Sequence, residues 1–176
     1  MYREELFDLN QFVLDTIVRD EALKIIRTDI DFVILLNLMD QKIVNYISKN
    51  KVLTLATSIN DKPHCANCFY VFDEVNKILI FLSDTTTQHI KEAIQNNTVA
   101  GTINTEVTTV AKIRGIQFMG NFVNPSKEQQ KDFYSIYYKK FPFAKAKPAK
   151  IWGVQLSWIK MTDNTLGFGK KLIWER

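Results

Sequence analysis

Hydrophobic residues recur at helical spacing from the start of the chain to about residue 50. Charged residues lie between them, and this periodicity predicts an amphipathic helical segment. Asp40 precedes a second apolar pattern and predicts the N-cap of one more helix, which would end near Asn50. We therefore expect an N-terminal helical extension over residues 1–40 and a second domain over residues 41–176. The positions that form the first stripe are Leu6, Leu9, Phe12, Val13, Ile17, Leu23, Ile26 and Ile30.

From Val52 onward the pattern changes to short runs rich in Val, Ile, Thr, Phe and Tyr, separated by turn residues. Such runs predict β-strands, and the short turns at 59–63 and 73–77 predict hairpin connections between them. The longest run would have to bend at Gly115 or Gly120, which favours a barrel over a sandwich. The runs that we expect as strands are 52–59, 64–72, 78–82, 99–103, 110–123, 152–161 and 171–174.

Two helices are predicted among these strands, over Gln88–Asn96 and Lys127–Lys140. Ser126 followed three residues later by Gln129 is the signature of a capping box at the start of the second helix. The segment 143–150, rich in Lys and Ala, is expected to be an exposed connection. The predicted fold class is therefore mainly β with helices.

Composition narrows the class of protein. With 46% hydrophobic residues, 6 Gly and 4 Pro, the chain of 176 residues should be globular, and the longest apolar run, 32–36, is too short to span a membrane. The acidic start, MYREELFD, is unlike a signal peptide, so we expect a cytoplasmic protein without a membrane partner. A net charge of +4 is modest for a nucleic-acid-binding protein, although lysines cluster between Lys139 and Lys150.

The segment from Leu82 to Lys91 carries the most informative chemistry. A strand there ends in Ser83 and a run of threonines just before a helix, with His89 in the first turn. Hydroxyl donors, free backbone N–H groups and the positive end of a helix together suit a phosphate group. The alternative is that Asp84 or a threonine caps the helix and does nothing else.

Other chemistry is disfavoured. Cys65 and Cys68 are three apart on a predicted strand, so their sulfur atoms should point to opposite faces, which fits neither a disulfide nor a metal site. We therefore expect reduced thiols and no metal. Neither His64 nor His89 has an obvious local partner for a Ser-His-Asp arrangement, which argues against a hydrolase. The glycines and lysines of 162–171 do not have Walker A spacing.

Several segments together resemble the FMN-binding split-barrel superfamily, which includes pyridoxamine 5'-phosphate oxidase, and most closely its small bacterial branch of uncharacterised members. The resemblance covers roughly residues 41–176 and implies a split β-barrel of six to seven antiparallel strands. The segments that carry it are 65–70 (CANCFY), 87–89 (TQH), 99–102 (VAGT), 113–120 (IRGIQFMG), 141–142 (FP) and 159–171 (IKMTDNTLGFGKK).

The resemblance also implies residues for a flavin site. The Ser-Arg-Lys phosphate clamp of the oxidase corresponds here to Thr87, Gln88 and His89, so the hydroxyl is kept while two firm cations are replaced. Tyr70 stands where the oxidase has a lysine, and the oxidase residues that hold its substrate's phosphate correspond to Gly167 and Gly169, which argues against vitamin B6 oxidation. The cofactor-binding residues expected on this basis are Cys65, Ala66, Asn67, Cys68, Tyr70, Leu82, Ser83, Thr87, Gln88, His89, Arg114, Gly115 and Lys171.

The leading hypothesis is a homodimer that binds FMN, or a related flavin or the deazaflavin F420, between its subunits and acts as an oxidoreductase on an unidentified small molecule. Flavin chemistry requires few acid–base residues of the protein, which fits this sequence. The first alternative is a non-catalytic split-barrel binder or sensor of haem or another tetrapyrrole. The second, which we rank below it, is a nucleic-acid-binding module that uses the lysines between 139 and 150.

Overall fold

The computed structural model describes residues 38–176, so the predicted helical extension lies, apart from residues 38–40, outside the described part. The described part forms one seven-stranded antiparallel sheet in the order β3-β2-β1-β4-β5-β6-β7, with a further pairing between β3 and β6. The predicted fold class, mainly β with helices, is confirmed. The strands are β1 (Val52–Ile59), β2 (Lys62–Asp73), β3 (Ile78–Leu82), β4 (Thr98–Asn104), β5 (Arg114–Val123), β6 (Ile151–Asp163) and β7 (Lys171–Glu175).

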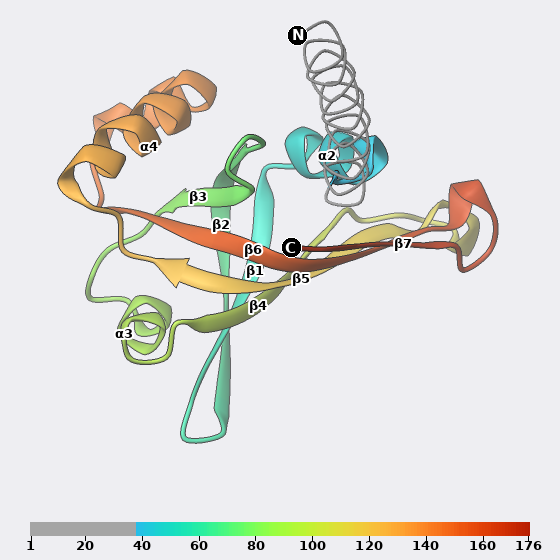
Figure 1. Cartoon of the computed structure of the whole chain (residues 1–176), viewed down its shortest axis with the longest axis horizontal. Coiled ribbons are helices and arrows are strands. Elements are labelled where there is room, and N and C mark those ends of the chain that lie inside the picture. The colour runs from blue at the N-terminus through green and yellow to red at the C-terminus, as the bar shows by residue number, and fades with distance from the viewer. Residues whose placement is uncertain (1–37) are drawn as a thin grey trace, which may run out of the picture. The chain divides into compact units, whose positions relative to one another are not determined.

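Strand β6 explains how the barrel both closes and splits. Its first residues pair with β3, from Ile78 opposite Gln155 to Leu82 opposite Ile151. Its second half instead pairs with β7, from Trp158 opposite Glu175 onward. One long strand therefore serves two neighbours in turn, and β7 extends the sheet beyond the closed part. Figure 1 shows the β6–β7 hairpin reaching away from α3.

Turn chemistry accounts for the connections. Asn60 and Asp61, both with positive φ (50° and 60°), join β1 to β2 as the predicted hairpin. In the β6–β7 connection Gly167 and Gly169 have φ values of 131° and 72°, a conformation that side chains disfavour, so the turn itself requires these glycines. The pairing of β5 with β6 shifts register between Met119 and Gly120, at one of the two predicted bends.

Strands β2, β4, β6 and β7 each extend one or two residues beyond the predicted runs, and the largest difference is at the start of β5. Residues Val110–Lys112 form a 3-10 turn, and β5 begins only at Arg114. The β-branched residue at the start of this run suggested a strand, but Val110 is exposed and the turn closes through a bond from Ile113 N to its carbonyl. No neighbouring strand extends far enough to pair with these residues, since β4 ends at Asn104.

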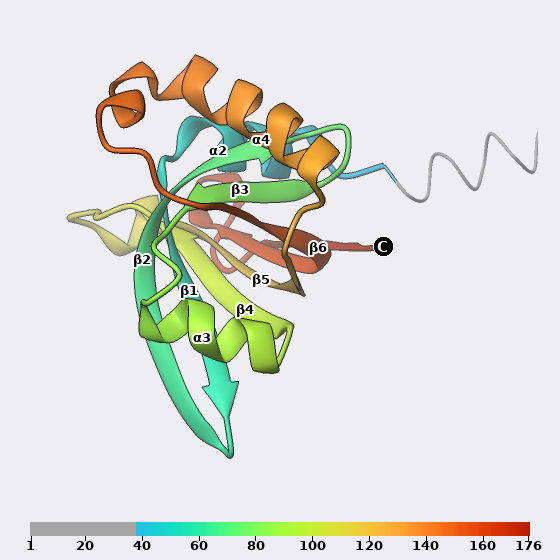
Figure 2. The same ribbon diagram turned by 90° about the vertical axis from the view of Figure 1, so that its left-hand side faces the viewer.

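Within residues 38–176, three α-helices lie around the barrel: α2 (Gln41–Lys49), α3 (Gln88–Gln95) and α4 (Lys127–Lys140). The predicted N-cap is confirmed, because Asp40 accepts from Lys42 N, and so is the capping box between Ser126 and Gln129. Helices α2 and α4 lie on one side of the barrel and α3 on the other (Figures 1 and 2).

The core has two parts. Alternate residues of the strands fill the barrel, among them the fully buried Leu55, Tyr70 and Trp152. A second cluster forms where α4 packs outside the barrel and buries Phe133 and Tyr137. The barrel wall is thus covered by α4 on one flank, and much of the remaining sheet face stays exposed.

Candidate functional site

The loop that connects β3 to α3 is held in place by its own residues. Asp84 Oδ1 accepts from the backbone N and the hydroxyl of Thr86, at 2.8 and 2.7 Å. Thr87 occupies the N-cap position of α3, but its side chain makes no capping bond and donates instead to the Asp84 carbonyl. The first-turn N–H groups of α3 therefore face outward without a side-chain cap, contrary to the alternative that this segment merely caps its helix.

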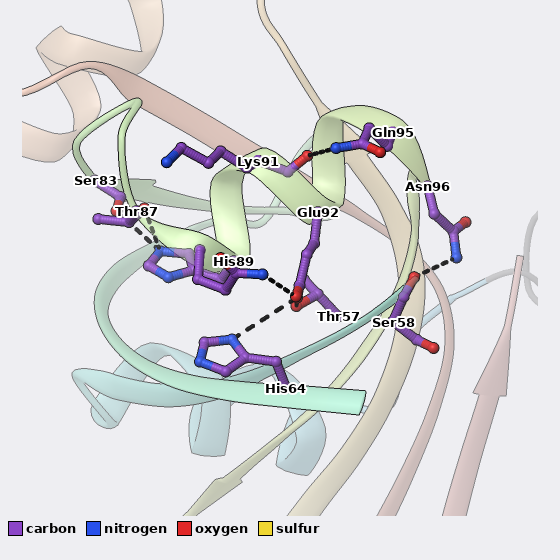
Figure 3. Close-up of polar contacts among 11 residues, drawn as sticks. Thr57, Ser58, His64, Ser83, Thr87, His89, Lys91, Glu92, Gln95 and Asn96 are labelled. Atoms are coloured by element: carbon purple, nitrogen blue, oxygen red, sulfur yellow. Dashed lines mark hydrogen bonds and ion pairs between the residues drawn. The ribbon is translucent and has the colours of Figure 1, made fainter. Parts of the chain in front are cut away.

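Ser83, Thr87 and His89 form a compact cluster at the start of α3 (Figure 3). Ser83 Oγ lies 2.9 Å from His89 Nε2 and 3.2 Å from Thr87 Oγ1. Burial lowers the pKa of His89, and the neighbouring His64 lowers it further, while Glu92 acts in the opposite direction. At neutral pH the cluster is accordingly a neutral group of hydroxyls and an imidazole.

Glu92, on the next turn of α3, places a carboxylate beside this cluster (Figure 3). It is 7% exposed and accepts from Thr57 Oγ1 at 2.5 Å and from Gln88 Nε2 at 2.6 Å. These hydrogen bonds, the one from Thr57 foremost, lower the pKa of Glu92 in spite of its burial, so it is ionised at neutral pH.

His64 faces the same carboxylate but does not satisfy it. Its Nδ1 lies 3.8 Å from Glu92 Oε2, beyond hydrogen-bond distance. Among residues 38–176, this Nδ1 is the buried side-chain nitrogen or oxygen that has no hydrogen-bond partner. An orphaned ring nitrogen and uncapped helix N–H groups thus lie around one polar cluster, which fits an anionic ligand group.

Strand β2 separates its predicted site residues onto two faces. Cys65 and Asn67 are exposed, and Asn67 Oδ1 accepts from the Thr54 hydroxyl. Cys68 lies inside, where burial raises its pKa to about 11, so the two thiols point to opposite faces as predicted. Tyr70 is also fully buried and donates from its hydroxyl to the carbonyl of Ile47 at 2.6 Å. The Tyr70 ring therefore belongs to the core, and only its backbone is placed to meet a ligand outside the barrel.

The outward face next to Cys65 is a shelf of small side chains. Cys65 lies opposite Ala56, Ala56 opposite Ala100, and Ala100 opposite Met119, so these four side chains form one row across β2, β1, β4 and β5. The small side chains are those of Cys65, Ala56 and Ala100; the row ends at the larger Met119, which is 48% exposed, and Phe69, 52% exposed, lies further along the same face of β2. Such a face suits a flat aromatic ligand or another copy of the sheet.

Arg114 lies away from the hydroxyl cluster. It begins β5 opposite Asp163, and its Nε donates to Asp163 Oδ2 at 3.1 Å. Burial alone would raise the pKa of Asp163, but hydrogen bonds from Thr165 and Arg114 outweigh that effect and lower it. The pairing of β1 with β4 puts this end of the sheet beyond Thr54, whereas α3 packs at Thr57. Arg114 therefore lies at the other end of the strands from the hydroxyl cluster of the same chain.

Gly115 and Lys171 share the Arg114 end, where both lie opposite Thr162 of β6. A cavity of about 490 Å³ opens there, next to α2, and cations line it without a carboxylate among the lining residues. Its lining comprises Asn45, Tyr46, Lys49, Asn50, Thr105, Val107, Lys112, Arg114 and Thr165. The predicted site residues thus fall into two groups at opposite ends of the strands.

Sequence reasoning missed three residues of the α3 cluster. Thr57 and Glu92 are 35 residues apart in the chain, and the sequence around neither residue predicts their hydrogen bond. Glu92 did leave a weak signal, since it follows Gln88 by one helical turn on an amphipathic helix. Lys150 is the third, because its carbonyl accepts from Ser83 N at 3.1 Å.

Solved structures with the same architecture place the chain among the split-barrel proteins of the pyridoxamine 5'-phosphate oxidase-like fold. A haem-binding protein from Mycobacterium smegmatis matches with a TM-score of 0.61 and 11% identity, over 74% of this chain and 56% of that one. An FAD-binding protein from Mesorhizobium loti gives 0.56 and 14%, over 70% and 94%. For a putative pyridoxamine 5'-phosphate oxidase from Listeria innocua the values are 0.55 and 14%, over 69% and 95%. At these identities the likeness shows the fold alone.

Sequence relatives identify the family. The chain is 43% identical over 136 residues to the UPF0306 protein of Serratia proteamaculans, a match that covers 77% of this chain and 94% of the relative. Identity to the UPF0306 protein of Photorhabdus laumondii is 42%, over 77% and 95%. The chain therefore belongs to the UPF0306 family, while no protein-family model matches it. None of the helices within residues 38–176 is both long and apolar enough to cross a membrane.

Proposed function

We propose that this protein binds FMN, with the phosphate at the Ser83–Thr87–His89 cluster and the flavin ring on the outer face of β2, and that it transfers hydride to or from a small molecule. The observation that carries the proposal is the start of α3, where hydroxyls and an imidazole lie beside first-turn N–H groups that have no side-chain cap. Backbone N–H groups at the start of a helix can bind phosphate without a lysine or arginine side chain.

The residues around this cluster fit a phosphate ester better than a free cation or an apolar group. Ser83 can donate its hydroxyl hydrogen, Thr87 can do so by exchanging its bond to the Asp84 carbonyl, and His89, neutral in the free protein, can take up a proton when an anion arrives. His64 Nδ1, which has no hydrogen-bond partner among the described residues, is a further donor when this nitrogen carries the ring hydrogen.

The shelf of Cys65, Ala56, Ala100 and Met119 supports the placement of the ring. Small side chains let a planar ligand approach the sheet, and the exposed Phe69 lies on the same outward face of β2. The same face is broad enough to pack against a second copy, so we include a homodimer in the proposal, with the ring between two chains. Exposed Met119 and Ile173, at 48% and 64%, would then become buried.

A bound flavin supplies hydride transfer at its N5 atom, so the protein needs to hold and orient rather than to donate protons. The cluster would anchor one end of the cofactor, and the shelf would keep its ring dry. Substrates of the vitamin B6 type are disfavoured, because the positions corresponding to the oxidase's phosphate-holding residues are the turn glycines Gly167 and Gly169.

Haem is the rival ligand, since a haem-binding protein shares the fold. The two histidines of this chain argue against it: His89 Nε2 is engaged by Ser83, and His64 Nδ1 is buried against Glu92. Iron ligation by His89 through Nε2 would break the cluster.

Retention on DNA at low salt tests the third hypothesis, that the lysines between 139 and 150 hold nucleic acid.

The deciding experiment titrates the full, cofactor-free chain with FMN, F420 and haem and follows the visible spectra. We expect a perturbed flavin spectrum with FMN, and about tenfold weaker binding, or 1.4 kcal/mol, in Thr87→Val. Thr108→Val, at an exposed threonine outside the cluster, is the matched control. No spectral change up to about 0.5 mM FMN, an affinity too weak to matter, would overturn the proposal, as would a Soret band that survives loss of both histidines.

Two further measurements test the ring position and the dimer. Bound FMN should slow alkylation of the exposed Cys65, while the buried Cys68 stays unreactive with and without FMN. Light scattering should give twice the chain mass. A flavin-loaded monomer, or an unprotected Cys65, would contradict this arrangement.

A further inference from the structure

The lysine-rich connection ends beside the phosphate cluster. The β3–β6 ladder pairs Phe81 with Trp152 and Leu82 with Ile151, and the bond from Ser83 N to Lys150 O, 3.1 Å long, continues it by one step. Residues directly opposite each other in an antiparallel pair place their side chains on the same side. Lys150 therefore starts on the side of the Ser83 hydroxyl, which contacts His89 and Thr87.

The ammonium of Lys150 lies over the ring of Trp152, a residue that is itself bonded to Ser83. Its Nζ lies 4.2 Å from the centroid of the buried Trp152 ring, and Trp152 Nε1 donates to the Ser83 carbonyl at 3.0 Å. The ion pairs within residues 38–176 are His64–Glu92 and Arg114–Asp163, so in that part of the chain no carboxylate neutralises Lys150. A cation resting on an aromatic ring gains little compared with a direct bond to phosphate, so it can move to one.

The charges of the cluster leave a need for such a cation. Glu92 is negative, His89 is neutral, and a phosphate monoester would add up to two more negative charges to the same region. Hydroxyl and N–H donors reduce that repulsion but do not remove it. The connection brings a second lysine to the loop as well, since Lys147 interacts with Asp84.

We propose that Lys150 supplies the cation that holds the phosphate, and that this lysine makes the site select flavin mononucleotide over riboflavin. The proposal rests on the proposed function, because it assigns one end of the same ligand. It gives the lysine-rich connection a role in binding that neither composition nor the Ser-Arg-Lys correspondence indicated.

The test compares the dissociation constants of FMN and riboflavin in the full chain. Lys150→Met keeps the aliphatic stem and removes the charge, so FMN should bind at least about tenfold more weakly while riboflavin changes less than about twofold. The salt dependence of FMN binding should fall in the same variant. Lys145→Met is the matched control, since Lys145 lies in the same connection but over the Tyr138 ring of α4.

A measurement on the unaltered chain keeps the proposal falsifiable if Lys150→Met does not fold. Acetylation of lysines, read by mass spectrometry, should be slowed at Lys150 by FMN and not by riboflavin, with Lys145 as the internal reference. Equal FMN affinity in Lys150→Met, an unprotected Lys150, or equal affinity of the native chain for FMN and riboflavin would overturn the role of Lys150 and leave flavin binding intact. Binding of neither flavin would overturn the proposed function itself.

Discussion

The two ends of the barrel both carry buried charge, and they use it differently. At the Arg114 end, the guanidinium and Asp163 face each other, and Thr165 satisfies the carboxylate from its backbone and hydroxyl. At the α3 end, the carboxylate of Glu92 is satisfied by neutral donors, while His64 Nδ1 has no hydrogen-bond partner among the described residues and the start of α3 has no side-chain cap. The Asp163 carboxylate has all its hydrogen bonds made, whereas the α3 end includes a buried ring nitrogen that could still bond to a ligand.

This difference teaches how to separate structural polar centres from binding sites. A buried carboxylate with all its bonds made, such as that of Asp163, is costly to remove but offers a ligand little. Donors that stay unpaired in a buried cluster are costly to the fold, so they persist where something else uses them. On this argument Asp163 belongs to the framework of this chain, and the α3 cluster is the better candidate for a binding site.

The largest expected effect is at the framework end. Asp163 is 2% exposed, and Asp163→Ala removes the acceptor for Thr165 and Arg114, so we expect the free energy of unfolding in urea to fall by about 3 kcal/mol. FMN affinity should change less than about twofold, because the α3 cluster is untouched. Asp132→Ala, at an exposed position of α4, is the control. A loss of FMN affinity without a loss of stability would place the ligand at the Arg114 end instead.

Most of the fold could be predicted because it depends on local patterns. Short runs rich in β-branched and other apolar residues matched the boundaries of β1 and β3 to the residue, and the capping box marked the start of α4. The largest departure, Val110–Lys112, is a segment whose composition favours a strand but which has no partner to pair with. Strand propensity reports a fit to a neighbouring strand, and a single sequence does not show where the neighbour ends.

The candidate site was harder to predict, because its bonds join distant segments. The hydroxyls of Ser83 and Thr87 could be found, since they precede a helix along the chain. The contact between Thr57 and Glu92 requires the register of β1 against α3, and the position of Lys150 requires the closure of β3 on β6. The separation of Arg114 from the cluster could not be predicted for the same reason, because a resemblance between motifs carries no information on which end of a strand each occupies.

An intermediate effect is expected at Glu92. Each carboxylate oxygen of Glu92 accepts one hydrogen bond, from Thr57 or from Gln88. In Glu92→Gln one of these oxygens becomes an NH₂ group, which cannot accept, so one bond is lost and the free energy of unfolding should fall by about 1–2 kcal/mol. The same change removes a negative charge next to the phosphate, and FMN should bind several-fold more tightly. Glu128→Gln, at the exposed start of α4, should alter neither quantity appreciably. Weaker FMN binding would show that Glu92 supports the ligand and does not oppose it.

The smallest effect is the pH dependence of stability, and it distinguishes the two groups of the α3 cluster. The folded state lowers the pKa of His89 below its ordinary 6.5 and that of Glu92 below its ordinary 4.5, through burial in the first case and hydrogen bonds in the second. In both windows the unfolded chain binds more protons, so stability should fall as the pH drops below 6.5 and fall again below 4.5.

Urea unfolding of the free protein over this pH range measures both losses. His89→Gln should flatten the first window and leave the second, whereas Glu92→Gln should do the reverse. Saturating FMN should weaken the first loss, because a phosphate beside His89 favours its protonated form and so raises its pKa toward or above that of the unfolded chain. An unchanged slope just below pH 6.5 in His89→Gln would mean that His89 is not the group that titrates there, and the neutral imidazole on which the cluster's chemistry depends would have to be abandoned.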